Sequence, residues 1–448
     1  AFSIAYDAIM KQAWLKIKRL LETQGSNILK PLLDSNKIKN ELKGYRLTYN
    51  QEGIVKFISS NDIKEYELND YITINEKLYM PNYDNCILNI DASLCKYYGI
   101  DVKYKTFGEL DNVLESRKYK HIAIMLLDGL GSYILRNNLL DNSFLRNHKV
   151  CDFNALFPPT TACCVPGLCS GIEPVETGWV GWSNYFSEVG KYVVMFRNEE
   201  YFSGEKLDIN ILGDILPYKN FYQDFSTHVF ELGPAFTPSK CETFKQMCDK
   251  YIAEVNKHES SFCYMYWGEP DTTMHITGAY SKDSKKVIKD IDDTLREFEK
   301  QLPLDTLIII TADHGHIDCK PIYLANFKDI LSLLTRLPSN EGRCAFFEVK
   351  PFKKGEFVKL FNSYFGDYFT LISKNDFIEE GYLGNNINNV NYKLDSFIGD
   401  FVAIGKKNYY FNFDPITSCE AQDEMVFKSH HAGITAAEMV IPFILVKK

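Results

Sequence analysis

The segment FPPTTACCVPGLCSG, residues 157–171, contains four side chains that could act as nucleophiles: Thr160, Thr161, Cys163 and Cys164. A threonine hydroxyl has a pKa far above 7, so it attacks an electrophile only when a base or a metal ion activates it. If a threonine is the nucleophile, the rest of the chain must therefore supply the activating group.

Cys164 offers a different chemistry. It is followed two residues later by Pro166, as in enzymes that convert the cysteine of a Cys-x-Pro-x-Arg signature to formylglycine and hydrolyse sulfate esters. In this chain the fourth position after the cysteine is Leu168 and not arginine. The missing arginine argues against the formylglycine chemistry.

Carboxylate and imidazole side chains follow two apolar runs. Asp128 comes directly after HIAIMLL (121–127) in a glycine turn, where an aspartate alone would usually cap the next helix. After FCYMYW (262–267), Asp271 stands four residues before His275. This spacing places both side chains on one face if the stretch is helical and not a loop. Taken alone, the pair is as consistent with a structural role as with metal binding.

Two more groups of this kind lie further along the chain. Asp313 and His314 are adjacent after TLIIIT (306–311), and Gly315 permits the turn that would direct both toward one ion. His430 and His431 stand shortly before VIPFILV (440–446). Each of these groups is a weak signal by itself.

Together the segments form a much stronger pattern. They contain three aspartates and five of the nine histidines, at positions 275, 314, 316, 430 and 431. Imidazole combined with carboxylate suits zinc or a similar borderline metal, whereas an oxygen-only set would have suggested magnesium or calcium. The pattern predicts two metal ions roughly 4 Å apart, which could hold a phosphoryl group during an in-line displacement.

The four apolar runs predict the elements that position these residues. Their continuous apolarity is typical of strands buried on both faces, as in a parallel sheet covered by helices. Between the second and third runs, residues 284–302 carry apolar side chains at helical spacing: Ile288, Ile291, Leu295, Phe298 and Leu302. The pattern therefore predicts an α/β fold, with ligands expected beyond the carboxyl ends of the strands.

Two regions differ from this core. Residues 1–78 combine a segment with one apolar and one basic face (6–21) with short alternating segments, and we expect a small α+β extension there. Residues from about 320 to 425 are rich in Asn, Tyr and Phe and contain short strand-like pieces. We interpret them as an inserted cap subdomain within a catalytic domain of residues 79–448.

Composition excludes several classes of function. The net charge of -9 argues against binding to nucleic-acid polymers. No run of eighteen apolar residues exists, so we expect no membrane span. The twelve cysteines are scattered and form no Cys-x-x-Cys pair, which favours a reducing compartment and a cytoplasmic location. Oligomeric state is not readable from the sequence.

From about residue 80 to its C-terminus, the chain resembles the alkaline phosphatase superfamily, and within it the nucleotide pyrophosphatase/phosphodiesterase group. The resemblance is carried by LLDGLG, FPPTTA, WGEPDTTMH, TADHGH and SHHAGIT, in this order and widely spaced. It implies an alkaline-phosphatase-like core, a mostly parallel sheet between helices. Residues 1–78 match nothing in that family.

The resemblance also implies roles for individual residues. One zinc ion would be held by Asp271, His275 and His431, and the other by Asp128, Asp313 and His314. Thr161 would be the nucleophile and would bind the second ion, which would lower the pKa of its hydroxyl so that no adjacent base is required. The residues after Thr161 would begin a helix with its amides toward the substrate. Thr160 would be only a neighbour, and Cys163 and Cys164 would be packing residues.

One segment departs from the family pattern. Where nucleotide pyrophosphatases have a phosphate-contacting asparagine in a HGIVGN-like string, this chain has TGWVGW, with Trp182 at the asparagine position. Asn184, two residues further on, could reach the same oxygen, or Trp182 could stack on a substrate group; alternatively Trp179 and Trp182 are buried wall residues. We therefore treat Trp182 and Asn184 as candidate substrate-binding residues.

The predicted activity is hydrolysis of small phosphodiesters, including nucleotide pyrophosphates, through a phosphothreonine intermediate. No arginine lies in the motif segments to balance a phosphomonoester dianion, which favours diesters. The competing hypotheses are a phosphomonoesterase, a phosphonate or sulfate-ester hydrolase or a phosphate-transferring mutase of the same superfamily, and a non-catalytic binding protein that has kept the fold.

Overall fold

The computed structural model describes residues 79–414 and 426–448, together with strands β1 (Tyr45–Tyr49) and β2 (Val55–Ser59). The chain divides into two compact units, residues 1–71 and 72–448. In the first unit β1 and β2 pair in antiparallel register, with Tyr45 opposite Ser59. The amphipathic segment 6–21 lies outside the described residues.

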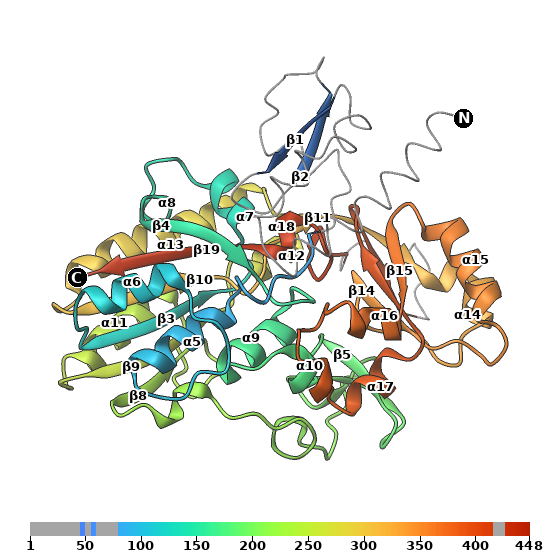
Figure 1. Ribbon diagram of the computed structural model, residues 1–448, viewed down its shortest axis with the longest axis horizontal. Coiled ribbons are helices and arrows are strands. Elements are labelled where there is room, and N and C mark those ends of the chain that lie inside the picture. Colours follow the sequence, from blue (N-terminus) through green and yellow to red (C-terminus); the bar gives the residue numbers. More distant parts are fainter. Residues whose placement is uncertain (1–44, 50–54, 60–78, 415–425) are drawn as a thin grey trace, which may run out of the picture. The chain divides into compact units, whose positions relative to one another are not determined.

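A six-stranded sheet forms the core of the second unit, in the order β4-β19-β10-β3-β9-β8 (Figure 1). Its strands are β3 (His121–Leu127), β4 (Lys149–Asn154), β8 (His228–Leu232), β9 (Ser261–Trp267), β10 (Thr306–Thr311) and β19 (Val440–Lys447). Strands β8, β9, β3 and β10 are mutually parallel, and β19 is antiparallel to both β10 and β4. All four predicted apolar runs are strands of this sheet, and the mostly parallel α/β architecture is confirmed.

Helices flank this sheet (Figure 1). One group consists of four helices that pack against one another: α5 (Leu88–Tyr97), α6 (Gly108–Ser116), α9 (Thr161–Ser170) and α10 (Pro174–Thr177). In a second group, four helices pack against the longest helix, α13 (Lys282–Gln301): α7 (Ser132–Asn138), α8 (Phe144–His148), α11 (Phe244–Val255) and α12 (Asp271–Thr277). The short helix α18 (Ala436–Met439) packs against α7. Helix α13 buries the predicted apolar stripe, and its N-cap is Ser281, whose hydroxyl accepts a hydrogen bond from the Ser284 amide.

A second sheet of seven strands is antiparallel throughout, in the order β15-β16-β14-β13-β5-β6-β7. Its strands are β5 (Ser183–Phe186), β6 (Lys191–Val194), β7 (Glu199–Glu200), β13 (Ser339–Glu341), β14 (Cys344–Phe347), β15 (Phe369–Ser373) and β16 (Phe401–Gly405). This sheet combines the region expected to be inserted with residues 183–200, which lie far upstream. Helices α14 (Lys328–Ser332), α15 (Lys354–Phe365), α16 (Lys374–Glu379) and α17 (Lys393–Ile398) accompany it.

Two further two-stranded ladders are separate from these sheets. Strand β11 (Ile317–Asp318) pairs with β18 (Ser429–His430), and β12 (Lys320–Tyr323) pairs with β17 (Tyr409–Asn412). Within the part of the chain that the structure describes, no helix has the length and apolarity needed to cross a bilayer.

Candidate metal centre and active site

Three parallel strands of the core sheet end at the candidate site. Leu127 at the end of β3 is in register with Trp267 at the end of β9, and Leu126 is in register with Thr311 at the end of β10. The residues that follow these strand ends are therefore neighbours in space. Asp128 follows β3 and Asp313 follows β10, and after β9 the chain begins α12.

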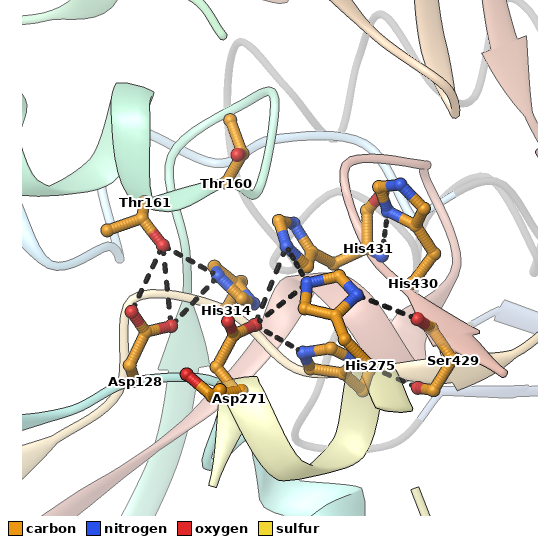
Figure 2. A network of polar contacts seen from close by, with 12 residues as sticks. Asp128, Thr160, Thr161, Asp271, His275, His314, Ser429, His430 and His431 are labelled. Carbon is orange, nitrogen blue, oxygen red and sulfur yellow. Dashed lines mark hydrogen bonds and ion pairs between the residues drawn. The ribbon is translucent and has the colours of Figure 1, made fainter. Parts of the chain in front are cut away.

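The β11–β18 ladder brings the later histidines to the same place. Ile317 is opposite His430 in this ladder, so His316 and His431, which flank the two strands, meet close to α12. Figure 2 shows the resulting network, in which His275, His431 and Asp271 face one another and Thr161 faces Asp128 and His314.

The first group, which we call the Asp271 cluster, consists of Asp271, His275, His316 and His431. Asp271 and His275 lie in α12, where Asp271 Oδ1 is 3.3 Å from His275 Nε2. His431 Nε2 is 3.2 Å from His275 Nε2 and 3.6 Å from Asp271 Oδ1. Zinc–nitrogen bonds of about 2.05 Å in a tetrahedral site place ligand atoms about 3.3 Å apart. The spacing of these three side chains therefore fits one zinc ion.

The second group, the Asp128 cluster, consists of Asp128, Asp313 and His314. His314 Nε2 is 3.3 Å from Asp128 Oδ1 and 3.6 Å from Asp313 Oδ2. Asp313 Oδ2 is buried and has no hydrogen-bond partner. A buried carboxylate oxygen without a partner is costly unless a cation binds it, so this oxygen also fits a metal ligand.

The imidazole rings present the correct atom to a metal. Nδ1 of His275, His314 and His431 lies 2.8–3.1 Å from the backbone carbonyl oxygens of Ser429, Gly315 and Pro159, respectively. A carbonyl only accepts hydrogen bonds, so Nδ1 must carry a proton, and in the neutral imidazole that binds a metal Nε2 then has the lone pair. All three Nε2 atoms belong to the two clusters.

The buried carboxyl groups of the site also favour the binding of cations. Burial raises the pKa of Asp128 to about 8, and the adjacent Asp313 and Asp271 carboxylates add to this effect. Burial likewise raises the pKa of Asp313. Burial alone would lower the pKa of His314, but Asp313 and Asp128 outweigh it and raise that pKa well above its usual value. Divalent cations would allow all the carboxylates to ionise.

Helix α9 positions Thr161 against the Asp128 cluster. Thr161 is the first residue of the helix, and its Oγ1 lies 3.2 Å from Asp128 Oδ2 and 3.2 Å from His314 Nε2. The next residues form the predicted helix, and Cys163 and Cys164 are fully buried in the core. Thr160 precedes the helix but does not cap it, because its hydroxyl donates to Glu341 Oε1 at 2.7 Å.

The candidate substrate residues lie in and before β5. Asn184 is fully buried, and its Nδ2 lies 3.4 Å from Asn340 Oδ1. Trp179 is also buried, with its Nε1 donating to the Leu216 carbonyl, so it is a wall residue. Trp182 is only partly buried, and the Arg197 guanidinium lies 5.5 Å from the centre of its ring. An arginine from outside the motif segments therefore reaches the candidate substrate wall.

The sequence pattern included His316 without assigning it a role, and it did not predict Ser429 or Tyr266 as residues of the site. His316 Nε2 lies 2.6 Å from Asp271 Oδ1, a hydrogen-bond distance that places His316 to orient this carboxylate. Ser429 Oγ contacts the other nitrogen of His316 at 2.8 Å. The Tyr266 hydroxyl donates to Asp128 Oδ2 from within β9. His316 could have been found from its place in ADHGH, whereas Tyr266 looks like a core residue in an apolar run.

A third group of possible ligands, His228, Glu254 and His258, has less suitable geometry. Both Nε2 atoms lie 3.1–3.2 Å from Glu254 Oε1, but the two rings are stacked 3.5 Å apart at an angle of 12°. A metal binds in the plane of an imidazole ring, along the lone pair. The two parallel rings would have to rotate apart before both could bind one ion.

Comparison with known proteins identifies the family. The family model described as type I phosphodiesterase / nucleotide pyrophosphatase matches residues 122–432. The chain belongs to this family, within the alkaline phosphatase superfamily, and its class is that of phosphodiesterase/pyrophosphatase-type hydrolases. A search of curated proteins gave no match.

Solved structures with similar folds include two from different enzymes. An inactive variant of murine ectonucleotide pyrophosphatase / phosphodiesterase 5 in complex with AMP has a TM-score of 0.52 at 16% identity, covering 73% of this chain and 87% of that chain. Phosphonoacetate hydrolase from Sinorhizobium meliloti in complex with phosphonoacetate has a TM-score of 0.54 at 14% identity, covering 74% of this chain and 90% of that chain. At this identity the likeness establishes the fold.

Proposed function

We propose that this chain hydrolyses small phosphodiesters, including nucleotide substrates, with Thr161 as the nucleophile. The observation that carries this proposal is the position of Thr161 Oγ1, 3.2 Å from both Asp128 and His314 and at the start of a helix. A hydroxyl in this position is directed at the ligands of a metal ion and at the space beyond the strand ends.

Two divalent ions, best matched by zinc, fit the two clusters. Asp271, His275 and His431 would hold one ion, and Asp128, Asp313, His314 and the Thr161 hydroxyl would hold the other. When bound, the ions supply Lewis acidity and lower the pKa of the Thr161 hydroxyl. The backbone carbonyls behind the histidines keep the Nε2 lone pairs directed at these positions.

The reaction uses Thr161 twice. In the first step the Thr161 hydroxyl gives its proton to solvent water and Oγ1 forms a bond to phosphorus, while the bond from phosphorus to the leaving alcohol oxygen breaks; that oxygen takes up a proton from solvent water. In the second step a water molecule loses a proton to solvent and its oxygen bonds to phosphorus, while the bond to Thr161 Oγ1 breaks and Oγ1 regains a proton, which releases a phosphomonoester. Amides at the N-terminus of α9 face the phosphoryl oxygens throughout.

The position of Arg197 bears on the choice of substrate. Its guanidinium lies near the Trp182 ring but also within 4.0 Å of Glu199, and its side chain is 62% exposed. A monoester dianion needs more positive charge than a diester monoanion. Glu199 pairs more closely with Lys206, at 2.7 Å, and therefore does not neutralise Arg197. We propose a diester preference because solvent screens the charge of this exposed guanidinium.

The test is a comparison of kcat/KM for bis(p-nitrophenyl) phosphate, p-nitrophenyl phosphate, p-nitrophenyl sulfate and phosphonoacetate, together with elemental analysis of the metal-saturated protein. We expect roughly two metal ions per chain and the highest kcat/KM for the diester. A tenfold preference for the monoester, about 1.4 kcal/mol in transition-state binding, would assign a phosphatase. Phosphonoacetate as the best substrate would assign a phosphonate hydrolase, and the sulfate ester would assign a sulfatase. Turnover of none of the four would indicate a binding protein.

A further inference from the structure

Glu341 is a buried carboxyl group that connects two segments of the candidate site. It ends β13 and is 5% exposed. Its Oε1 accepts a hydrogen bond from Thr160 Oγ1 at 2.7 Å and another from the Trp182 backbone N–H at 2.8 Å. Thr160 directly precedes the candidate nucleophile, and Trp182 is a candidate substrate residue. One oxygen atom therefore joins the segment of the nucleophile to the segment of the substrate wall.

Asn340, the neighbour of Glu341 in β13, helps to form this contact. Asn340 has a left-handed backbone with φ of +83°, and its Nδ2 donates to the Cys344 carbonyl at 2.9 Å. Its side chain packs so closely against Gly181 that a Cβ atom there would lie 2.0 Å from Asn340 Oδ1. The absence of a side chain at residue 181 thus lets the Trp182 segment approach Glu341.

The burial of Glu341 requires an explanation, because a carboxyl group removed from water is costly. Burial raises the pKa of Glu341 to about 7, and the hydrogen bonds from Thr160 and Trp182 oppose this shift. Thr160 stands at the N-cap position of α9, but its hydroxyl donates a hydrogen bond to Glu341 and does not cap the helix. An apolar residue at position 341 would avoid the cost of burying a carboxyl group, and a Thr160 hydroxyl bonded to the backbone would cap α9. The contact between Glu341 and Thr160 replaces both of these arrangements.

We propose that Glu341 is a positioning residue that holds the Thr161 hydroxyl and the Trp182 segment in register with the metal ligands. This inference rests on the proposed function, because it assigns Thr161 as the nucleophile. It means that the second sheet, whose strands come from two distant parts of the chain, contributes to the reaction without touching the reacting atoms. A shift of about 1 Å in a nucleophile can cost on the order of 100-fold in rate.

Four variants separate the two contacts. Thr160→Val breaks only the contact to the nucleophile segment, and we expect kcat to fall at least tenfold with KM changed less than threefold. Glu341→Ala breaks both contacts, so kcat falls and KM rises as well. Glu341→Gln keeps an oxygen acceptor and Thr160→Ser keeps the hydroxyl, and both should stay within about threefold of wild type. The matched control is Glu348→Gln, since Glu348 lies in the same region but pairs with Arg336 at 3.1 Å.

A second measurement does not depend on activity. Hydrogen exchange of the Trp182 amide, measured on the full-length metal-loaded protein, should accelerate in Glu341→Ala but not in Glu341→Gln or Glu348→Gln. A purely structural role for Glu341 would instead accelerate exchange across the whole second sheet and leave kcat unchanged for folded, metal-loaded enzyme.

The outcomes are distinguishable from failure of the proposed function. If wild type hydrolyses none of the esters, the proposed function fails, and exchange at Trp182 alone decides whether Glu341 positions the segment. A Glu341→Ala variant with two metals, wild-type kcat and unchanged exchange at Trp182 overturns the inference. If Glu341→Ala does not fold, the comparison of kcat between Thr160→Val and Thr160→Ser tests the positioning role of Glu341. Equal kcat in these two variants would overturn the inference.

Discussion

Thr161 and Cys164 both lie in α9, but their surroundings differ. Thr161 Oγ1 faces a carboxylate and an imidazole of the Asp128 cluster. Cys164 is fully buried, with its Sγ 3.8 Å from the Leu156 carbonyl oxygen. A thiol in such a position is inaccessible to a substrate, so its chemistry is that of a small core residue.

Replacing Thr161 by alanine should therefore remove turnover, by about 1,000-fold or more, because only the attacking oxygen forms the covalent intermediate. Cys164→Ala should retain turnover within about tenfold, since it changes packing alone. The measurement is steady-state hydrolysis of bis(p-nitrophenyl) phosphate at equal metal content. Loss of activity in Cys164→Ala but not in Thr161→Ala would show that the nucleophile is wrongly assigned.

At the scale of elements, a buried ion pair fixes the loop that carries His431. Arg343, in the turn between β13 and β14, lies with its Nη2 2.9 Å from Glu438 Oε2 in α18. Glu438 also accepts hydrogen bonds from the Gly433 amide at 2.8 Å and from Thr435 Oγ1 at 2.7 Å. The second sheet is thus connected to the residues directly after His431, a candidate metal ligand.

Arg343→Met should destabilise the protein by about 3–5 kcal/mol, because it leaves the Glu438 carboxylate buried without its cation. Arg343→Lys keeps the positive charge and should cost less. Urea unfolding of the metal-free variants measures the difference. We also expect Arg343→Met to lose the ion of the Asp271 cluster more readily than wild type; unchanged stability and metal retention would contradict this account of the loop.

At the scale of the whole molecule, metal removal should make stability depend on pH. Above about pH 6.5, the raised pKa values of Asp128 and His314 mean that the folded protein binds more protons than the unfolded chain. Stability is then lost as pH rises through about 8. The lowered pKa values of His316, His430 and His431 act in the opposite direction, but only below about pH 6.5, where the unfolded histidines still bind protons.

We therefore expect the Tm of metal-free protein to be a few degrees lower at pH 8.5 than at pH 6.5. Metal-saturated protein should show a smaller change or the opposite one, because the bound ions keep the carboxylates ionised. Thermal unfolding in the presence and absence of a chelator gives both values. Equal pH dependence with and without metal would show that these carboxylates are not the ligands.

The division of the chain into two units leads to a further prediction. Residues 72–448 contain the core sheet, the second sheet and every residue of the Asp271 cluster and the Asp128 cluster. Removing residues 1–71 should therefore leave kcat within about threefold, with two metal ions still bound. A loss of turnover in a folded, metal-loaded 72–448 fragment would show that the first unit takes part in the reaction.

The sequence by itself determined four of the six strands of the core sheet, but not β4 or β8, and most of the residues at the edge of the sheet. Strands buried on both faces are continuously apolar, so the sequence could locate β3, β9, β10 and β19. Apolarity carries no information on the direction of a strand, and β19 runs antiparallel to β10. Carboxyl ends of parallel strands meet at one edge, which is why Asp128 and Asp313 could be expected near each other. Asp271 and His275 depended only on helical spacing within α12.

Only the tertiary structure decided the contacts made between distant segments. The second sheet pairs Asn340 with Ser183, and no local pattern in residues 183–200 indicates this partner. The same pairing brings Glu341 to Thr160 and Trp182. The β11–β18 register brings His316 to Asp271 and Ser429 to His316. Hydrophobic periodicity reports which face of an element is buried, but not which polar side chain of a remote element it meets. That choice depends on register and packing across the whole fold.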